Sequence, residues 1–119
     1  MARRLAPSVA WVIAIFWIGN GMWAFLAPQS FYDQLATFPP YNVHFIHDIG
    51  AFSIGLGAVI AFARLGWTAL RSALVGVGVG SVVHVVSHVV DYDLKPSVSD
   101  IVGLSVFALV TLAAGLAVD

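Results

Sequence analysis

The chain has 119 residues, of which 61% are hydrophobic and only 9% are charged. Its mean hydropathy is +0.97, whereas soluble domains are roughly 45–50% apolar and about 25% charged. Five basic and six acidic side chains cannot cover the surface of a water-soluble monomer. The net charge of −1 argues against nucleic acid as a partner, and the lack of cysteine excludes disulfides and thiolate metal sites. We therefore expect a single integral membrane domain over 1–119, with the lipid bilayer as its main partner.

Four segments are long and apolar enough to cross about 30 Å of hydrocarbon, which takes roughly 20 helical residues. Pro28 follows the first segment, Asn42 precedes the second as an N-cap, and Lys95-Pro96 separate the last two. Continuous apolar runs are typical of helices rather than of alternating barrel strands. The sequence therefore predicts an all-α, four-helix transmembrane bundle with spans at about 8–27, 43–63, 68–90 and 98–118.

The first segment also has features of a signal peptide, because two arginines precede it. It is longer than the usual apolar region of a signal peptide, and no good small-residue cleavage site follows it. We expect it to be retained as a span.

The segment between the first two spans has a helical pattern of its own. Phe31, Leu35 and Phe38 share one helical face, and Ser30 and Asp33 have the spacing of a capping box. This pattern predicts a short amphipathic helix on the membrane surface.

The basic residues indicate an orientation. Arg3 and Arg4 precede the first span, Arg64 and Arg71 flank the loop between the second and third spans, and Lys95 alone lies on the opposite side. By the positive-inside rule, we expect an integral plasma-membrane protein with both termini in the cytoplasm.

The polar residues of the spans gather at the opposite, extracytoplasmic end. The second span opens with His44, His47 and Asp48, and the third closes with His84, His88 and Asp91. At 100° per residue, each set projects from one helical face. If these two spans are antiparallel neighbours, His44 should face His88 and Asp48 should face His84, because the depths match.

Small residues on the same two spans favour such a contact. Gly76 and Gly80 continue the histidine face of the third span inward, and Gly55 lies on the second span. Small residues at helical spacing let helices approach closely in lipid, which would hold the histidines in place.

The polar set indicates a metal site, because unpaired ionisable groups inside a membrane are costly and a carboxylate is unfavourable at a helix C-terminus. Imidazole and carboxylate ligands without sulfur suit zinc, copper(II), iron or manganese. The chain has no glutamate, which disfavours a Glu-x-x-His di-iron site, and the crowded aspartates disfavour bis-histidine haem. The candidate metal ligands are His44, Asp48, His84, His88 and Asp91.

The stretch from Pro40 to Ala51 resembles a pattern of uncharacterised, loosely DoxX-like four-helix membrane proteins of actinobacteria. In that pattern, Tyr-Asn-x-His-x-x-x-Asp-x-Gly opens the second span and His-x-x-x-His closes the third. Position 47 is often Arg there, so the resemblance does not extend to His47. It implies the topology and the place of the site, and no activity. The matching positions here are Tyr41, Asn42, His44, Asp48, Gly50, His84 and His88.

Three functions fit these features. The first is a metal-binding membrane protein, with redox activity left open. The second is an accessory subunit of a larger membrane complex, or a homo-oligomer, in which the His/Asp set is a hydrogen-bond network. The third, a proton-coupled carrier, is disfavoured because the cytoplasmic half of the bundle has no ionisable relay.

Overall fold

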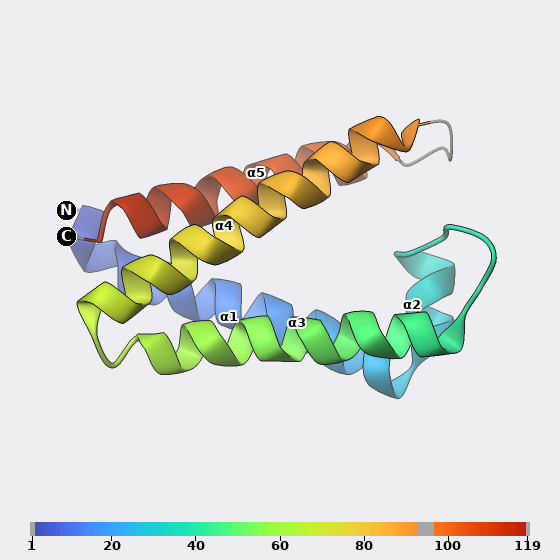
Figure 1. The fold of residues 1–119 in the computed structure, drawn as a ribbon, viewed down its shortest axis with the longest axis horizontal. Coiled ribbons are helices and arrows are strands. Elements are labelled where there is room, and N and C mark those ends of the chain that lie inside the picture. The colour runs from blue at the N-terminus through green and yellow to red at the C-terminus, as the bar shows by residue number, and fades with distance from the viewer. Residues whose placement is uncertain (1, 93–96, 119) are drawn as a thin grey trace.

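The computed structural model describes residues 2–92 and 97–118, and over these ranges the chain contains helices and no strand. Four of the helices are long and apolar enough to span a membrane. The expected all-α, four-helix transmembrane bundle is confirmed, including the short helix between the first two spans (Figure 1). The helices are α1 (Ala2–Leu26), α2 (Pro28–Gln34), α3 (Val43–Ala63), α4 (Trp67–Val90) and α5 (Val98–Leu116).

The helix boundaries agree closely with the predicted spans, except at the start of α1. This helix begins at Ala2 and includes Pro7 as its sixth residue, where the proline lacks the backbone N–H that would donate to the carbonyl four residues earlier. The predicted N-cap of α3 is confirmed, since Asn42 Oδ1 accepts a hydrogen bond from the Phe45 backbone N–H at 3.1 Å. Lys95 and Pro96, which were expected to separate the last two spans, lie outside the described residues.

The short helix α2 forms, but the predicted capping box does not. Pro28 occupies its first turn, and no side chain caps it. Ser30 Oγ instead accepts a hydrogen bond from Trp23 Nε1 of α1 at 3.2 Å, and Asp33 Oδ1 accepts one from Gln29 Nε2 at 2.8 Å. Phe31 is buried and anchors α2 in a small apolar cluster with residues of α1 and α3.

The long helices pack mainly as two pairs, α1 with α3 and α4 with α5 (Figure 1). Glycines lie where the helices of a pair meet. A Cβ atom added to Gly21 would lie 2.7 Å from the Gly50 carbonyl oxygen, and one added to Gly57 would lie 2.7 Å from the Ala14 carbonyl oxygen. In the second pair, a Cβ on Gly78 would lie 2.7 Å from the Leu112 side chain. These pairs approach closely because the contact residues have no side chain.

The prediction of a close contact between the second and third spans through Gly55, Gly76 and Gly80 is wrong. A Cβ atom added to Gly55, Gly76 or Gly80 would meet no atom within 4 Å, so these glycines do not form a helix contact. Helices α3 and α4 are consecutive and antiparallel, but α3 turns the face that carries Gly50 and Gly57 to α1. Sequence order therefore did not identify the packing partner.

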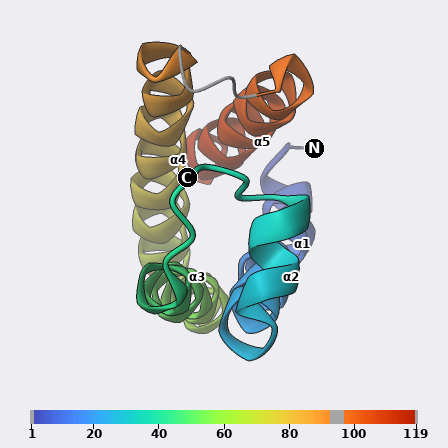
Figure 2. The same cartoon turned by 90° about the vertical axis from the view of Figure 1, so that its right-hand side faces the viewer.

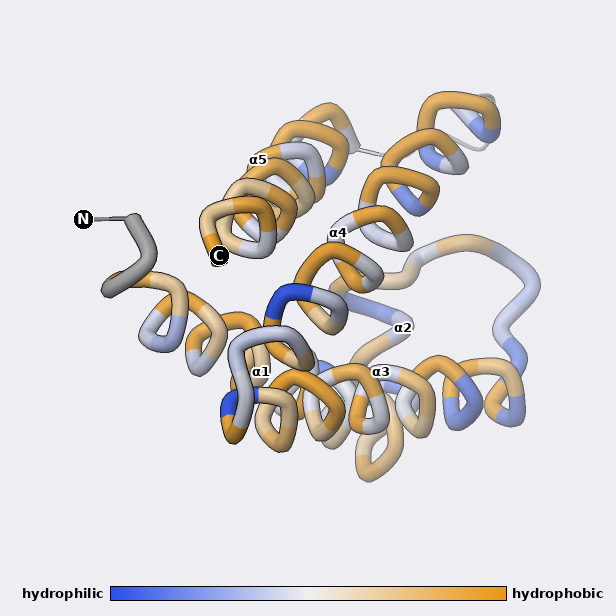
Figure 3. The backbone as a smooth tube through the Cα atoms, turned by 60° about the vertical axis from the view of Figure 1, so that its left-hand side comes forward, coloured by the Kyte–Doolittle hydropathy of each residue, from blue (hydrophilic) through white to orange (hydrophobic). Residues whose placement is uncertain are grey.

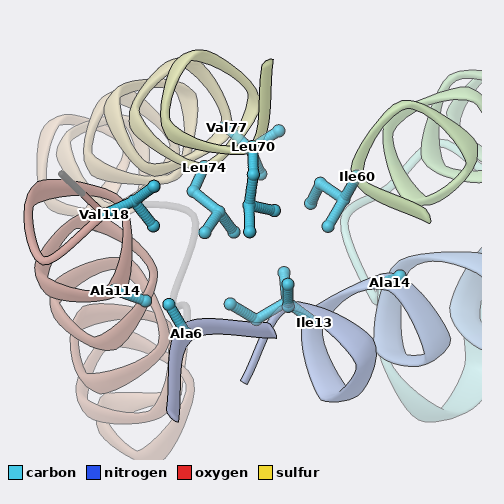
Figure 4. Close-up of a cluster of buried hydrophobic side chains, with 10 residues drawn as sticks. Ala6, Ile13, Ala14, Ile60, Leu70, Leu74, Val77, Ala114 and Val118 are labelled. Carbon is cyan, nitrogen blue, oxygen red and sulfur yellow. The ribbon is translucent and has the colours of Figure 1, made fainter. Parts of the chain in front are cut away.

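One apolar core joins all four long helices, and it lies at the end of the bundle that holds both termini and the α3–α4 loop (Figure 4). We call this end the terminal end, and the opposite end, with the start of α3 and the end of α4, the histidine end. The two helix pairs diverge toward the histidine end (Figures 1 and 2). The core residues are Ala6, Ala10, Ile13, Ala14, Ile60, Leu70, Leu74, Val77, Ala114 and Val118.

The outer surface of the bundle is apolar. Hydrophobic residues dominate along all four long helices (Figure 3), and large side chains such as Phe52, Phe62 and Leu109 are exposed. A soluble monomer rarely exposes so large an apolar surface, whereas lipid solvates it. The exposed surface therefore fits a membrane protein.

Candidate functional site

Two histidines of α4 lie side by side at the histidine end. His84 and His88 are one helical turn apart, a spacing that places both side chains on one face. Their Nε2 atoms are 3.2 Å apart, and the ring centroids are 5.0 Å apart. The two imidazoles can therefore share a proton or bind one ligand together.

His88 is partly covered by the loop that joins α2 to α3. The edge of the Phe38 ring approaches the imidazole, with 5.7 Å between the ring centroids. His88 Nδ1 is buried and has no hydrogen-bond partner among the described residues. The rings of Tyr32 in α2 and Tyr41 before α3 are in contact, with 5.0 Å between their centroids, so the two ends of this segment lie close together.

A second polar pair lies at the start of α3. His44 Nε2 is 3.6 Å from Asp48 Oδ2, and the two side chains are 85% and 53% exposed. His47 is turned toward α1 instead, where its ring centroid is 5.1 Å from that of Phe25. His47 therefore packs against an aromatic side chain of α1.

The structure does not bring these two pairs together. Over residues 2–92 and 97–118, no three His, Cys, Asp or Glu side chains are placed to hold one metal ion. The expected contacts of His44 with His88 and of Asp48 with His84 are absent. The reason is the pairing of α3 with α1: Ile46 and Gly50 are buried on the α1 side, and Asp48, two residues from each, lies about 160° around the helix.

Asp91, the last candidate ligand, ends α4. Its backbone N–H donates to the Ser87 carbonyl at 2.8 Å, which makes it the C-cap residue. Its side chain is exposed and forms no hydrogen bond or ion pair with another described residue. Asp91 therefore remains available to a ligand without being held toward His84 and His88.

The sequence alone did not indicate Phe38 as a neighbour of His88. It placed Phe38 on the surface helix with Phe31, but α2 ends at Gln34 and the chain then crosses toward α4. The sequence did indicate that the helix ends before Phe38, because Phe38 precedes Pro39 and a helical conformation is disfavoured for a residue before proline.

No family model matches the chain, and no curated protein or solved structure shows significant similarity to it.

Proposed function

We propose that this protein binds a divalent transition metal through His84 and His88 within the membrane. The observation that supports it most strongly is the 3.2 Å separation of the two Nε2 atoms. A tetrahedral metal with bonds of about 2.0–2.1 Å to two imidazoles separates their nitrogens by about 3.3–3.4 Å. The histidine pair is therefore close to the geometry of a two-ligand chelate without any movement of α4.

Further ligands come from water or from the nearby polar residues of this end. His44 and Asp48 form the second candidate pair, and Asp91 is a supporting carboxylate. Imidazole with carboxylate and water suits zinc, copper(II) or iron, and open positions on the metal would leave room for substrate or redox chemistry. The two helix pairs would have to close at the histidine end for one metal to bind all four side chains of His44, Asp48, His84 and His88.

The proposed site lies at the extracytoplasmic face of the plasma membrane. This assignment rests on the positive-inside rule, because Arg64 and Arg71 belong to the terminal end, together with both termini. The resemblance of the site residues to the motif of loosely DoxX-like four-helix proteins supports the same assignment.

The test is elemental analysis and an absorption spectrum of protein purified without chelator, for the wild type, His84→Ala and His47→Ala. We expect stoichiometric metal in the wild type and a metal affinity at least about 100-fold lower in His84→Ala. The reason is that losing a metal ligand lowers the affinity more than losing a residue that only orients a ligand. His47→Ala is the matched control and should keep the metal. The proposal fails if the wild type carries no metal and gains no thermal stability from zinc, copper, iron or manganese.

A second candidate function is that of an accessory subunit in a larger membrane complex. The highly exposed His44–Asp48 pair favours it, since these side chains have no other partner in the described chain and a neighbouring subunit would bury them. In this case the 3.2 Å contact between His84 and His88 is an N–H···N hydrogen bond. Purification in a mild detergent should then return a second protein in fixed stoichiometry, and recovery of the chain alone would contradict this candidate.

A further inference from the structure

An apolar groove of about 610 Å³ lies between α3 and α4 near the terminal end. It continues toward the histidine end as a second hollow of about 380 Å³ that shares Val59, Ser72 and Ala73 with the first. The groove exists because α3 and α4 pack on other helices, so their facing small side chains do not fill the space between them. Its lining includes Ala58, Phe62, Ala63, Ala69, Ser72 and Ala73.

The surroundings of this groove favour a hydrocarbon occupant. Both walls belong to helices apolar and long enough to span the membrane, so the opening faces lipid. Ser72 does not need water, because its hydroxyl donates to the Thr68 carbonyl at 3.0 Å. Water has too few polar partners here to be held, and an empty space would forfeit dispersion contacts.

The charge at the terminal end favours an anionic head group. The groove ends at Ala63 and Ala69; Arg64 follows Ala63 in the chain, and Arg71 follows two residues after Ala69 on α4. The Arg64 guanidinium stacks over the Trp11 ring at 4.4 Å, and Arg71 Nη1 donates to the Val118 carbonyl at 3.3 Å. Among the described residues, every aspartate lies at the histidine end, so no carboxylate side chain of residues 2–92 and 97–118 pairs with either arginine.

We propose that an anionic phospholipid binds along this groove, with an acyl chain between α3 and α4 and its phosphate at the level of Arg64 and Arg71. Basic residues beside gaps between membrane helices attract anionic head groups, at about 1 kcal/mol for each Lys or Arg near the surface. This proposal does not depend on the metal site, which lies at the other end of the bundle.

The experiment is native mass spectrometry of the detergent-solubilised full chain, incubated with phosphatidylglycerol or with phosphatidylcholine of the same acyl chains. Gly76→Leu places a side chain in the second hollow, where Gly76 belongs to the lining and has open space for it. Gly103→Leu is the matched control, because Gly103 of α5 also has open space but lies outside the groove. Arg64→Gln removes one positive charge from the terminal end.

We expect the wild type and Gly103→Leu to retain phosphatidylglycerol in preference to phosphatidylcholine, and Gly76→Leu to lose this retention. Arg64→Gln should weaken the preference about fivefold. Equal retention of the two lipids by the wild type overturns the anionic assignment, and equal retention by the two leucine variants overturns the groove. A dimer that Gly76→Leu abolishes, with unchanged lipid binding, would assign the groove to a second copy and also overturn the proposal.

Discussion

At the scale of single residues, glycines with the same sequence environment have different roles in this bundle. Gly55 and Gly57 are two residues apart on α3, and both lie among apolar residues. A Cβ atom on Gly57 would lie 2.6 Å from Ile18 Cγ1 and 2.7 Å from the Ala14 carbonyl oxygen, whereas one on Gly55 would meet nothing within 4 Å. Of these two glycines, only Gly57 is therefore required for the contact between α3 and α1.

This difference predicts opposite effects of the same substitution. Gly57→Ala should destabilise the protein by about 1–3 kcal/mol, because the added methyl group forces two backbones apart. Gly55→Ala should be neutral or stabilise by up to about 1 kcal/mol, through the helix propensity of alanine. The free energy of unfolding, measured in mixed micelles by denaturing detergent, distinguishes the two. Equal effects at both positions would contradict the α1–α3 contact.

At the scale of helices, pairing decides which polar residues can meet. Helix α3 packs on α1, which turns His47 toward Phe25 and leaves His44 and Asp48 on the opposite side. Helix α4 packs on α5 and carries His84 and His88 as a separate pair. Four of the five candidate ligands therefore form two pairs on two helices.

Double-cysteine variants test this pairing against a cysteine-free background. Phe25→Cys with His47→Cys should be joined efficiently by the shortest bifunctional thiol reagent, because these side chains are in contact across α1 and α3. His44→Cys with His88→Cys should not be joined, although the sequence predicts that contact. Gel mobility under denaturing conditions reports the cross-link. Efficient joining of the second pair, without added metal, would show that α3 and α4 meet at the histidine end.

At the scale of the whole molecule, the two helix pairs are held together chiefly at one end. Their common core lies at the terminal end, and near mid-span the Phe107 ring of α5 contacts Phe16 and Trp17 of α1. At the histidine end, the apolar cluster of Ala24, Phe31 and Ile46 involves only α1, α2 and α3. The Phe38–His88 ring contact links the α2–α3 loop to α4 at the histidine end, but the main apolar packing between the two pairs lies at the terminal end.

The orientation of the bundle gives a prediction at this scale. Leu65 in the α3–α4 loop is 90% exposed, and Tyr92 after α4 is 55% exposed. If the basic terminal end faces the cytoplasm, a membrane-impermeant maleimide added to whole cells should label Tyr92→Cys. The same reagent should label Leu65→Cys only after permeabilisation. The reverse pattern would place both termini outside and would contradict an extracytoplasmic metal site.

The sequence by itself determined the four spans, the N-cap at Asn42 and the division of the molecule into a basic end and a histidine end. It could do so because hydrocarbon requires every backbone polar group to be bonded within its own helix, so the length and hydropathy of each segment identify each span. The sequence placed the candidate ligands on their helices but not relative to one another. Several faces of α3 and α4 carry small residues, and periodicity does not show which face meets a neighbour. Only the tertiary structure decided that Gly50 and Gly57 pack on α1 while Gly55 stays free. Partner choice follows from close backbone contact between helices far apart in the sequence, and that choice separated His44 and Asp48 from His84 and His88.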